Sequence, residues 1–234
     1  MSFNGGEEKE KLLGATSLEY NQEAGPMKYL IGTEQGYVLL ANKRPNNPVS
    51  ILTKFGFDTG KHHGPIYSLW RNPAHPKYFM SVGDWTAKIW ADELSQPIMQ
   101  TRYHQAYLTD GYWSPTRPGL FYLTRVDGFL DVWDFYYRQN EVAYSQKISD
   151  SPLTTIKILG SMSAIGDAEG TVSIMKLSPP LYETAPNNKE KDDMAIVFDR
   201  EQRREKLLWV EAKKLREAAE KAKDPKSKPK EDPV

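Results

Sequence analysis

Two groups of residues in this sequence have the types and the order that a hydrolase uses. In each group a histidine precedes a hydroxyl side chain, an aspartate follows the hydroxyl by three residues, and a tryptophan follows the aspartate by six. A histidine that takes a proton from a hydroxyl while a carboxylate orients its ring is the arrangement that activates a serine nucleophile. The two groups are His63, Ser81, Asp84 and Trp90, and then His104, Thr124, Asp127 and Trp133.

A structural role explains these groups better than catalysis does. The hydroxyl, the aspartate and the tryptophan recur together 43 residues later. Buried polar groups that hold a repeat together recur in every repeat, because each one needs a hydrogen-bond partner. Neither hydroxyl lies in the G-x-S-x-G pattern that exposes a nucleophilic serine. We therefore predict eight structural residues and no catalytic residue.

Metal and cofactor chemistry is not predicted either. His62 and His63 are adjacent and His75 follows, but this spacing matches neither a helical nor a short-loop set of metal ligands. The sequence contains no phosphate-binding glycine loop, no paired-carboxylate constellation suited to acid–base catalysis and no H-E-x-x-H motif. The prediction is a protein that is not an enzyme and has no cofactor.

A repeat dominates the first 178 residues. Four copies of a turn followed by an alternating strand open at Gln35, Asp84, Asp127 and Glu169, at intervals of 49, 43 and 42 residues. An apolar run precedes each turn, so each copy predicts a β-hairpin. A period of about 40 to 45 residues is typical of WD-repeat propeller blades.

The predicted fold is therefore an all-β WD-repeat β-propeller segment of about four blades, followed by a C-terminal α-helix. The blades are expected at about 10–60, 62–103, 104–150 and 152–178, after a flexible N-terminus over 1–9. At about 42 residues a blade, this region is too short for the usual complete propeller. We expect the C-terminal half of a longer protein, a shortened isoform, or a propeller completed by another chain.

The composition excludes several classes of protein. Lys plus Arg and Asp plus Glu are both 31, which leaves no net basic charge for general nucleic-acid binding. There is no cysteine, so a disulfide-rich secreted scaffold is not expected. Neither a signal peptide nor a long apolar span is visible. A cytoplasmic or cytoskeletal protein without a membrane role is predicted.

The chain after Pro179-Pro180 changes to a charged composition. We expect a linker over 179–197, a charged amphipathic helix over 198–223 that is capped by Asp199 and Gln202, and a disordered tail over 224–234. Apolar residues recur at spacings of four and three along one face of this helix. The helix either packs on its own propeller, lies in solvent or docks on a neighbouring subunit. Docking is favoured because Leu208 and Trp209 would otherwise be costly to expose, and Leu215 is a further candidate for partner binding.

Three aromatic residues after the third blade have two interpretations. Phe135, Tyr136 and Tyr137 follow the Trp-Asp pair at 133–134. Aromatic side chains on propeller loops anchor protein partners, and they also pack between blades. Both interpretations stay open from the sequence.

Several longer phrases are more specific than a generic blade. They are His62 to Pro73, Val82 to Trp90, Tyr107 to Asp110, Gly32 to Gly36, Asp127 to Phe135, and the tail phrase Phe198 to Lys206. Together they resemble the C-terminal blades of axonemal dynein intermediate chains, of the outer-arm intermediate chain 2 type. The resemblance covers about residues 25 to 215.

This resemblance implies a function and a location. In that family the propeller docks on a dynein heavy-chain tail, two different intermediate chains pair, and an extended N-terminal region recruits light chains. It therefore implies a non-catalytic scaffold of an outer-arm dynein in the axoneme of a cilium or flagellum. Light-chain binding is not expected, because the region that performs it is absent here. The alternative is a general WD-repeat adaptor that recruits another soluble protein.

Overall fold

Four antiparallel sheets form most of the molecule. The computed structural model describes residues 13–57, 59–184 and 189–223, so the expected flexible segment 1–9 and tail 224–234 lie outside the described residues. The first two sheets consist of β1 (Ala15–Glu19), β2 (Lys28–Thr33), β3 (Val38–Asn42) and β4 (Ser50–Phe55), and of β5 (Ile66–Arg71), β6 (Tyr78–Gly83), β7 (Thr86–Ala91) and β8 (Met99–Gln100). The other two consist of β9 (Leu108–Trp113), β10 (Leu120–Arg125), β11 (Phe129–Asp134) and β12 (Tyr144–Lys147), and of β13 (Leu153–Leu159), β14 (Met162–Asp167) and β15 (Val172–Lys176).

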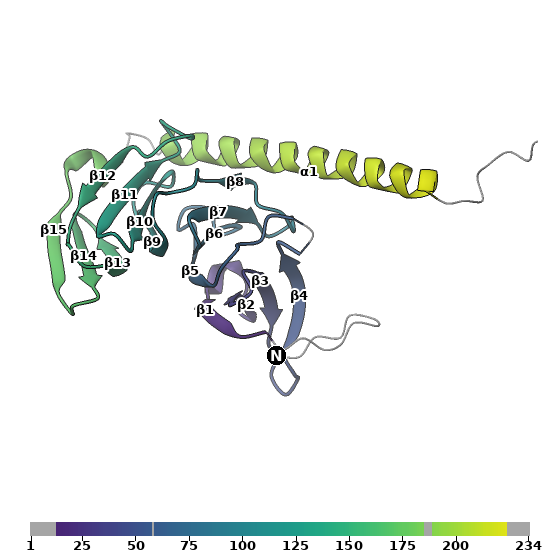
Figure 1. Ribbon diagram of the computed structural model, residues 1–234, viewed down its shortest axis with the longest axis horizontal. Coiled ribbons are helices and arrows are strands. Elements are labelled where there is room, and N and C mark those ends of the chain that lie inside the picture. The colour runs from purple at the N-terminus through teal and green to yellow at the C-terminus, as the bar shows by residue number, and fades with distance from the viewer. Residues whose placement is uncertain (1–12, 58, 185–188, 224–234) are drawn as a thin grey trace, which may run out of the picture.

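The sheets are arranged as propeller blades. Within each sheet the strands pair in chain order, and the first strands of neighbouring sheets contact one another. Figure 1 shows the sheets following one another in an arc from β1–β4 to β13–β15. The predicted four-blade WD-repeat architecture is therefore confirmed. Among the described residues the last blade has three strands, where each of the others has four.

Apolar side chains fill the spaces between blades, because alternate residues of each strand face the neighbouring sheet. Phe55 of the first blade packs edge-on against Phe79 and Trp90 of the second. Phe121, Trp133 and other buried residues of the third blade join a cluster with residues of the second. A further cluster joins the third and fourth blades, and it contains Leu120, Tyr122, Leu130, Val132, Leu153, Ile156, Ile158, Ile165 and Leu177.

The hairpins of the second and third blades differ in length. The turn between β6 and β7 has two residues, because Gly83 pairs with Thr86. The turn between β10 and β11 has three, because β10 ends at Arg125 and β11 begins at Phe129. In the shorter turn, Asp84 adopts a positive φ of 51°. In the longer turn, the residue with a positive φ is Gly128, at 84°. This difference decides which polar side chains meet inside each blade.

One long helix follows the blades. Two short 3-10 helices occur at η1 (Gln22–Ala24) and η2 (Pro179–Leu181), and α1 then runs from Lys189 to Lys223. The prediction that the helix begins at 198 was wrong, because its first turns are fixed by contacts with the blades. Asp199 therefore lies inside the helix and is not its N-cap. Figure 1 shows α1 crossing the side of the arc, with its C-terminal half extending past the sheets.

The helix is strongly charged along its whole length. Within the described ranges, no helix is both long and apolar enough to span a membrane.

Candidate functional site

Ser81 lies at the centre of a buried polar cluster in the second blade. Its hydroxyl lies 2.8 Å from His62 Nε2, and it accepts a hydrogen bond from Trp90 Nε1 at 2.8 Å. His62 Nδ1 lies 3.3 Å from the Asp84 carboxylate. All four residues are completely buried. The cluster ties the segment before β5 to the hairpin of β6 and β7.

The structure corrects the predicted histidine from His63 to His62. The side chain of His63 is exposed, and only its backbone N–H reaches the cluster, where it donates to Asp84 Oδ2 at 2.8 Å. Adjacent residues in an extended segment point in opposite directions. The spacing of the motif identified the histidine pair, but it did not show which of the two faces inward.

Burial and hydrogen bonding set the charges of this cluster. Burial lowers the pKa of His62, although Asp84 acts in the opposite direction. Burial alone would raise the pKa of Asp84, but hydrogen bonds from His62, the His63 backbone and Thr86 outweigh it and lower that pKa to about 2. A neutral His62 therefore donates from Nδ1 to a charged Asp84 and accepts at Nε2 from Ser81. Because the Ser81 hydroxyl is completely buried, it cannot reach a substrate.

The third blade repeats the aromatic frame of the second. Phe79 stacks on Trp90 with ring centroids 6.2 Å apart, and Phe121 stacks on Trp133 at the same distance. Each phenylalanine is also paired with its tryptophan across the hairpin. The tryptophan follows the phenylalanine by 11 residues in the second blade and by 12 in the third. The third hairpin is thus one residue longer.

This extra residue removes the hydroxyl from the third cluster. Two residues after the stacked phenylalanine stand Ser81 in the second blade and Leu123 in the third. Thr124 therefore lies on the opposite face of β10, where its Oγ1 is 2.8 Å from Thr109 Oγ1. The prediction that Thr124 joins His104 and Trp133 was wrong for this reason.

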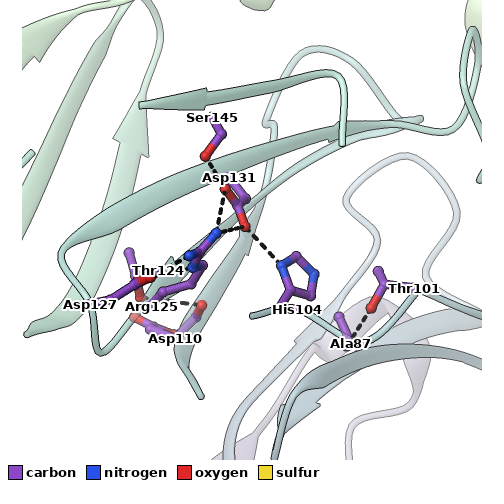
Figure 2. Close-up of polar contacts among 9 residues, drawn as sticks. All are labelled: Ala87, Thr101, His104, Asp110, Thr124, Arg125, Asp127, Asp131 and Ser145. Atoms are coloured by element: carbon purple, nitrogen blue, oxygen red, sulfur yellow. Dashed lines mark hydrogen bonds and ion pairs between the residues drawn. The ribbon is translucent and has the colours of Figure 1, made fainter. Parts of the chain in front are cut away.

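Asp131 replaces Asp127 as the partner of His104. His104 Nδ1 lies 2.8 Å from Asp131 Oδ2, and Ser145 donates to Asp131 Oδ1 at 2.5 Å. Arg125 bonds to both Asp127 and Asp131, as Figure 2 shows. Burial acts to raise the pKa of Asp131, but the hydrogen bonds from His104, Ser145 and Arg125 outweigh it and lower that pKa. Asp127 stays at the surface, so its predicted position in the buried set was wrong.

Two of the three histidines considered as metal ligands have other partners. His62 belongs to the Ser81 cluster, and His75 Nε2 lies 3.0 Å from the carbonyl oxygen of Lys191. In the part of the chain that the structure describes, no three His, Cys, Asp or Glu side chains are grouped so that they could hold a metal ion.

The three aromatic residues after the third blade have different surroundings. Phe135 is buried and packs edge-on against Phe121, so of its two interpretations the structure supports packing in the core. The Tyr136 hydroxyl donates to Asp193 Oδ2 of α1 at 2.9 Å. Tyr137 is 71% exposed. Of the three, only Tyr137 is free to meet a partner with most of its surface.

The N-terminal half of α1 is anchored in the blade core. Met194 and Phe198 are completely buried in the cluster between the second and third blades. The rings of Phe198 and Tyr78 lie 4.7 Å apart, and the Tyr78 hydroxyl donates to Asp199 Oδ1 at 2.6 Å. Sequence analysis missed these contacts. The spacing of four between Met194 and Phe198 was the signal that could have revealed them.

Arg117 adds a buried ionic link between the blades and the helix. It donates through Nε to Glu190 at 2.9 Å and through a terminal nitrogen to Asp134 at 2.8 Å. Asp134 belongs to β11 and Glu190 to the first turn of α1. A buried ion pair is costly to break, because removing one partner leaves the other charged group buried without a counter-ion. The start of the helix is thereby fixed on the third blade.

The C-terminal half of α1 presents apolar side chains to solvent. Leu208, Trp209 and Leu215 are 50%, 37% and 72% exposed. Leu208 and Trp209 line a groove of about 460 Å³ between the helix and a loop that contains Gln96. We name the exposed stripe Leu208, Ala212, Leu215 and Ala219 the distal stripe.

Comparisons with known proteins agree on one family. Residues 9–177 match the family model described as the dynein axonemal intermediate chain 3 WD40 domain. The 70 kDa intermediate chain of the flagellar outer arm of Chlamydomonas reinhardtii is 42% identical over 91% of this chain and 37% of its own length. Dynein axonemal intermediate chain 2 of Xenopus laevis is 44% identical over 87% of this chain and 34% of its own length. The chain thus spans about a third of these relatives.

The fold also matches a solved structure. The computationally designed Ika4 protein aligns with a TM-score of 0.56 over 74% of this chain and 95% of its own, at 16% identity. At this identity the likeness concerns the fold alone.

Proposed function

Because the chain belongs to the WD-repeat family of axonemal dynein intermediate chains, we propose that it is a non-catalytic scaffold subunit of an outer-arm dynein. Relatives named for the flagellar outer arm and for cilia place the family in the axoneme. In this role the chain holds other subunits together and performs no chemistry of its own. The buried Ser81 hydroxyl, which no substrate can reach, is consistent with that role.

The anchored helix is the observation that carries this proposal. The first half of α1 is fixed by Phe198, by Tyr78 and by the Arg117 ion pairs, so its direction is set by the blades. The second half projects past the blades with the distal stripe exposed. An apolar stripe on an isolated surface helix gains stability when a partner covers it. A rigid helix presented in this way is suited to hold another subunit.

The partners proposed are a dynein heavy-chain tail and a second intermediate chain. The distal stripe and the exposed ring of Tyr137 are the surfaces assigned to them. Light chains are not assigned to this chain, and no surface for nucleic acid or membrane is proposed, since the charges of the chain balance.

Affinity purification of the tagged chain from ciliated cells, with chemical cross-linking and mass spectrometry, tests this function. We expect a dynein heavy chain among the recovered proteins, cross-linked through lysines of the distal half of α1, Lys206, Lys213 and Lys214. Recovery of a stable chain with unrelated soluble proteins and without any dynein subunit would favour the general adaptor instead.

A further inference from the structure

The groove beside Trp209 lies between the distal half of α1 and two loops of the blades. Leu208, Trp209 and Ala212 form its apolar lining on the helix, and Thr59 and Gln96 line it from the loops. The apolar lining is accessible, since Leu208 is 50% exposed and Trp209 is 37% exposed. An apolar side chain of a partner can therefore cover the Trp209 ring.

The charged residues of this groove are all basic. Lys213 and Arg216 complete its lining, and no carboxylate lines it among the described residues. Lys213 has one ion pair, with Glu217 at 4.0 Å, and it is weak because both side chains are more than half exposed. Within the part of the chain that the structure describes, Arg216 has no hydrogen bond or ion pair. The groove therefore carries unbalanced positive charge beside an apolar floor.

The charge changes sign on the other side of Trp209. Glu93 and Glu205 line a smaller cavity of about 110 Å³, which Trp209 also lines. Glu205 precedes Trp209 by one helical turn and Lys213 follows it by one turn, so the two charges lie on opposite sides of the ring along the helix. A polyanionic surface would bring negative charge to both sides and be repelled by the two glutamates. A protein segment can place a carboxylate on the basic side alone.

The distal stripe indicates the shape of that segment. Its residues follow one another at spacings of four, three and four from Leu208 to Ala219. A second helix that lies along α1 meets a stripe with these spacings over its whole length. Ala212 and Ala219 are small, and the distance between two packed helices depends on the side chains at their contact. The stripe therefore suits a closely packed partner helix.

We propose that the groove binds the acidic end of an amphipathic helix of a protein partner. An apolar side chain of that helix covers Leu208 and Trp209, and carboxylates about one turn further along pair with Lys213 and Arg216. The inference rests on the proposed scaffold function, because it describes the partner that the distal stripe holds. It adds selection by charge to that contact.

Binding of defined peptides to the purified whole chain tests the charge selection. Three dye-labelled helical peptides, each about three heptads long, share a leucine seam and differ only at two flanking positions of one end heptad. These positions are both Glu, both Gln or both Lys. Fluorescence anisotropy measures the affinity of each peptide, and circular dichroism checks that the protein variants keep their helix.

We expect the Glu peptide to bind about five-fold more tightly than the Gln peptide, as two exposed ion pairs allow, and the Lys peptide to bind most weakly. The differences should shrink as sodium chloride is raised to about 0.5 M. Lys213→Glu with Arg216→Glu should reverse the order of the peptides.

The matched control is Lys206→Glu with Lys214→Glu, which changes the charge of the same helix equally at two exposed residues outside the groove lining. It should keep the order of the peptides. Equal binding of the three peptides, or equal effects of the two double variants, would overturn the proposal. So would binding of phosphatidylserine vesicles that needs Lys213 and Arg216 when no peptide binds.

The same two double variants separate this inference from the scaffold function. After affinity purification from ciliated cells, loss of the dynein heavy chain with the groove variant alone supports both. Equal recovery of the heavy chain by both variants contradicts the groove assignment and leaves the scaffold function standing. Charge-selective peptide binding without any recovery of a dynein subunit contradicts the scaffold function and leaves the groove assignment standing.

Discussion

At the scale of single residues, the second and third blades differ by one residue in one hairpin, and this residue reorganises a buried polar cluster. In the second blade Ser81 satisfies both His62 and Trp90. In the third blade Leu123 occupies the position that corresponds to Ser81, and His104 is hydrogen-bonded to Asp131. The same aromatic frame therefore supports a cluster centred on a serine in one blade and a histidine–aspartate pair in the next.

The Ser81 cluster should contribute measurably to stability. Ser81→Ala leaves His62 Nε2 and Trp90 Nε1 buried without a partner, so we expect the free energy of unfolding to fall by about 2 kcal/mol or more. Urea denaturation at neutral pH measures this change. Ser50→Ala, on an exposed strand residue, is the control and should stay within about 0.5 kcal/mol. A loss for Ser81→Ala as small as the control's would show that the cluster is not a stabilising element.

His62 should make the stability depend on pH. Its pKa is lowered by burial, so on acidification below about 6.5 the unfolded chain binds a proton that the folded chain does not. The free energy of unfolding therefore falls as the pH drops from about 6.5 towards the lowered pKa. His62→Gln should reduce this slope by up to one proton, or about 1.4 kcal/mol per pH unit. Denaturation at several pH values between 7 and 5 tests it, and an unchanged slope would contradict it.

The sequence placed these polar groups in the correct hairpins but could not assign every partner. His63 was predicted in place of His62 because the spacing of a motif does not show which of two adjacent side chains faces inward. Thr124 and Asp127 were predicted because they lie 43 residues after Ser81 and Asp84, and a constant interval of this kind implies hairpins of equal length. Only pairing across the hairpin, Phe121 with Trp133, shows the extra residue.

At the scale of elements, the N-terminal half of helix α1 is packed on the blades and its C-terminal half projects past them. Phe198 is completely buried, while Ile196, two residues earlier, is 67% exposed. Phe198→Ala should therefore cost about 3–5 kcal/mol through the cavity that it leaves, and Ile196→Ala should cost little. Urea denaturation gives the free energies, and limited proteolysis near residue 189 reports release of the helix. Equal effects of the two variants would argue against an anchored helix.

The strands were predictable because each hairpin repeats a turn and an alternating strand, and all four blades follow from that repeat. The start of the helix was not. The residues from 189 to 197 carry five charges and read as a linker, and their order comes from contacts with distant residues such as Arg117 and Tyr136. Tertiary contacts of this kind leave only a weak trace in local sequence.

At the scale of the whole molecule, the blades form an arc and α1 crosses its side, with its C-terminal half extending past the sheets (Figure 1). The distal stripe on that half is exposed. The net charge of zero gives no long-range attraction to nucleic acid, so recognition must come from particular surfaces. The distal stripe is such a surface.

The most direct test of the scaffold function is the recovery of a dynein heavy chain with variants of the distal stripe. Leu208→Asp with Leu215→Asp places two charges in the stripe, and Leu207→Asp, at a 67% exposed residue on another face of the same helix, is the matched control. After affinity purification from ciliated cells, we predict that the double variant loses at least ten-fold of the heavy chain, about 1.4 kcal/mol of binding, while the control retains it. Equal recovery by all three proteins would contradict the assignment of the distal stripe to heavy-chain docking.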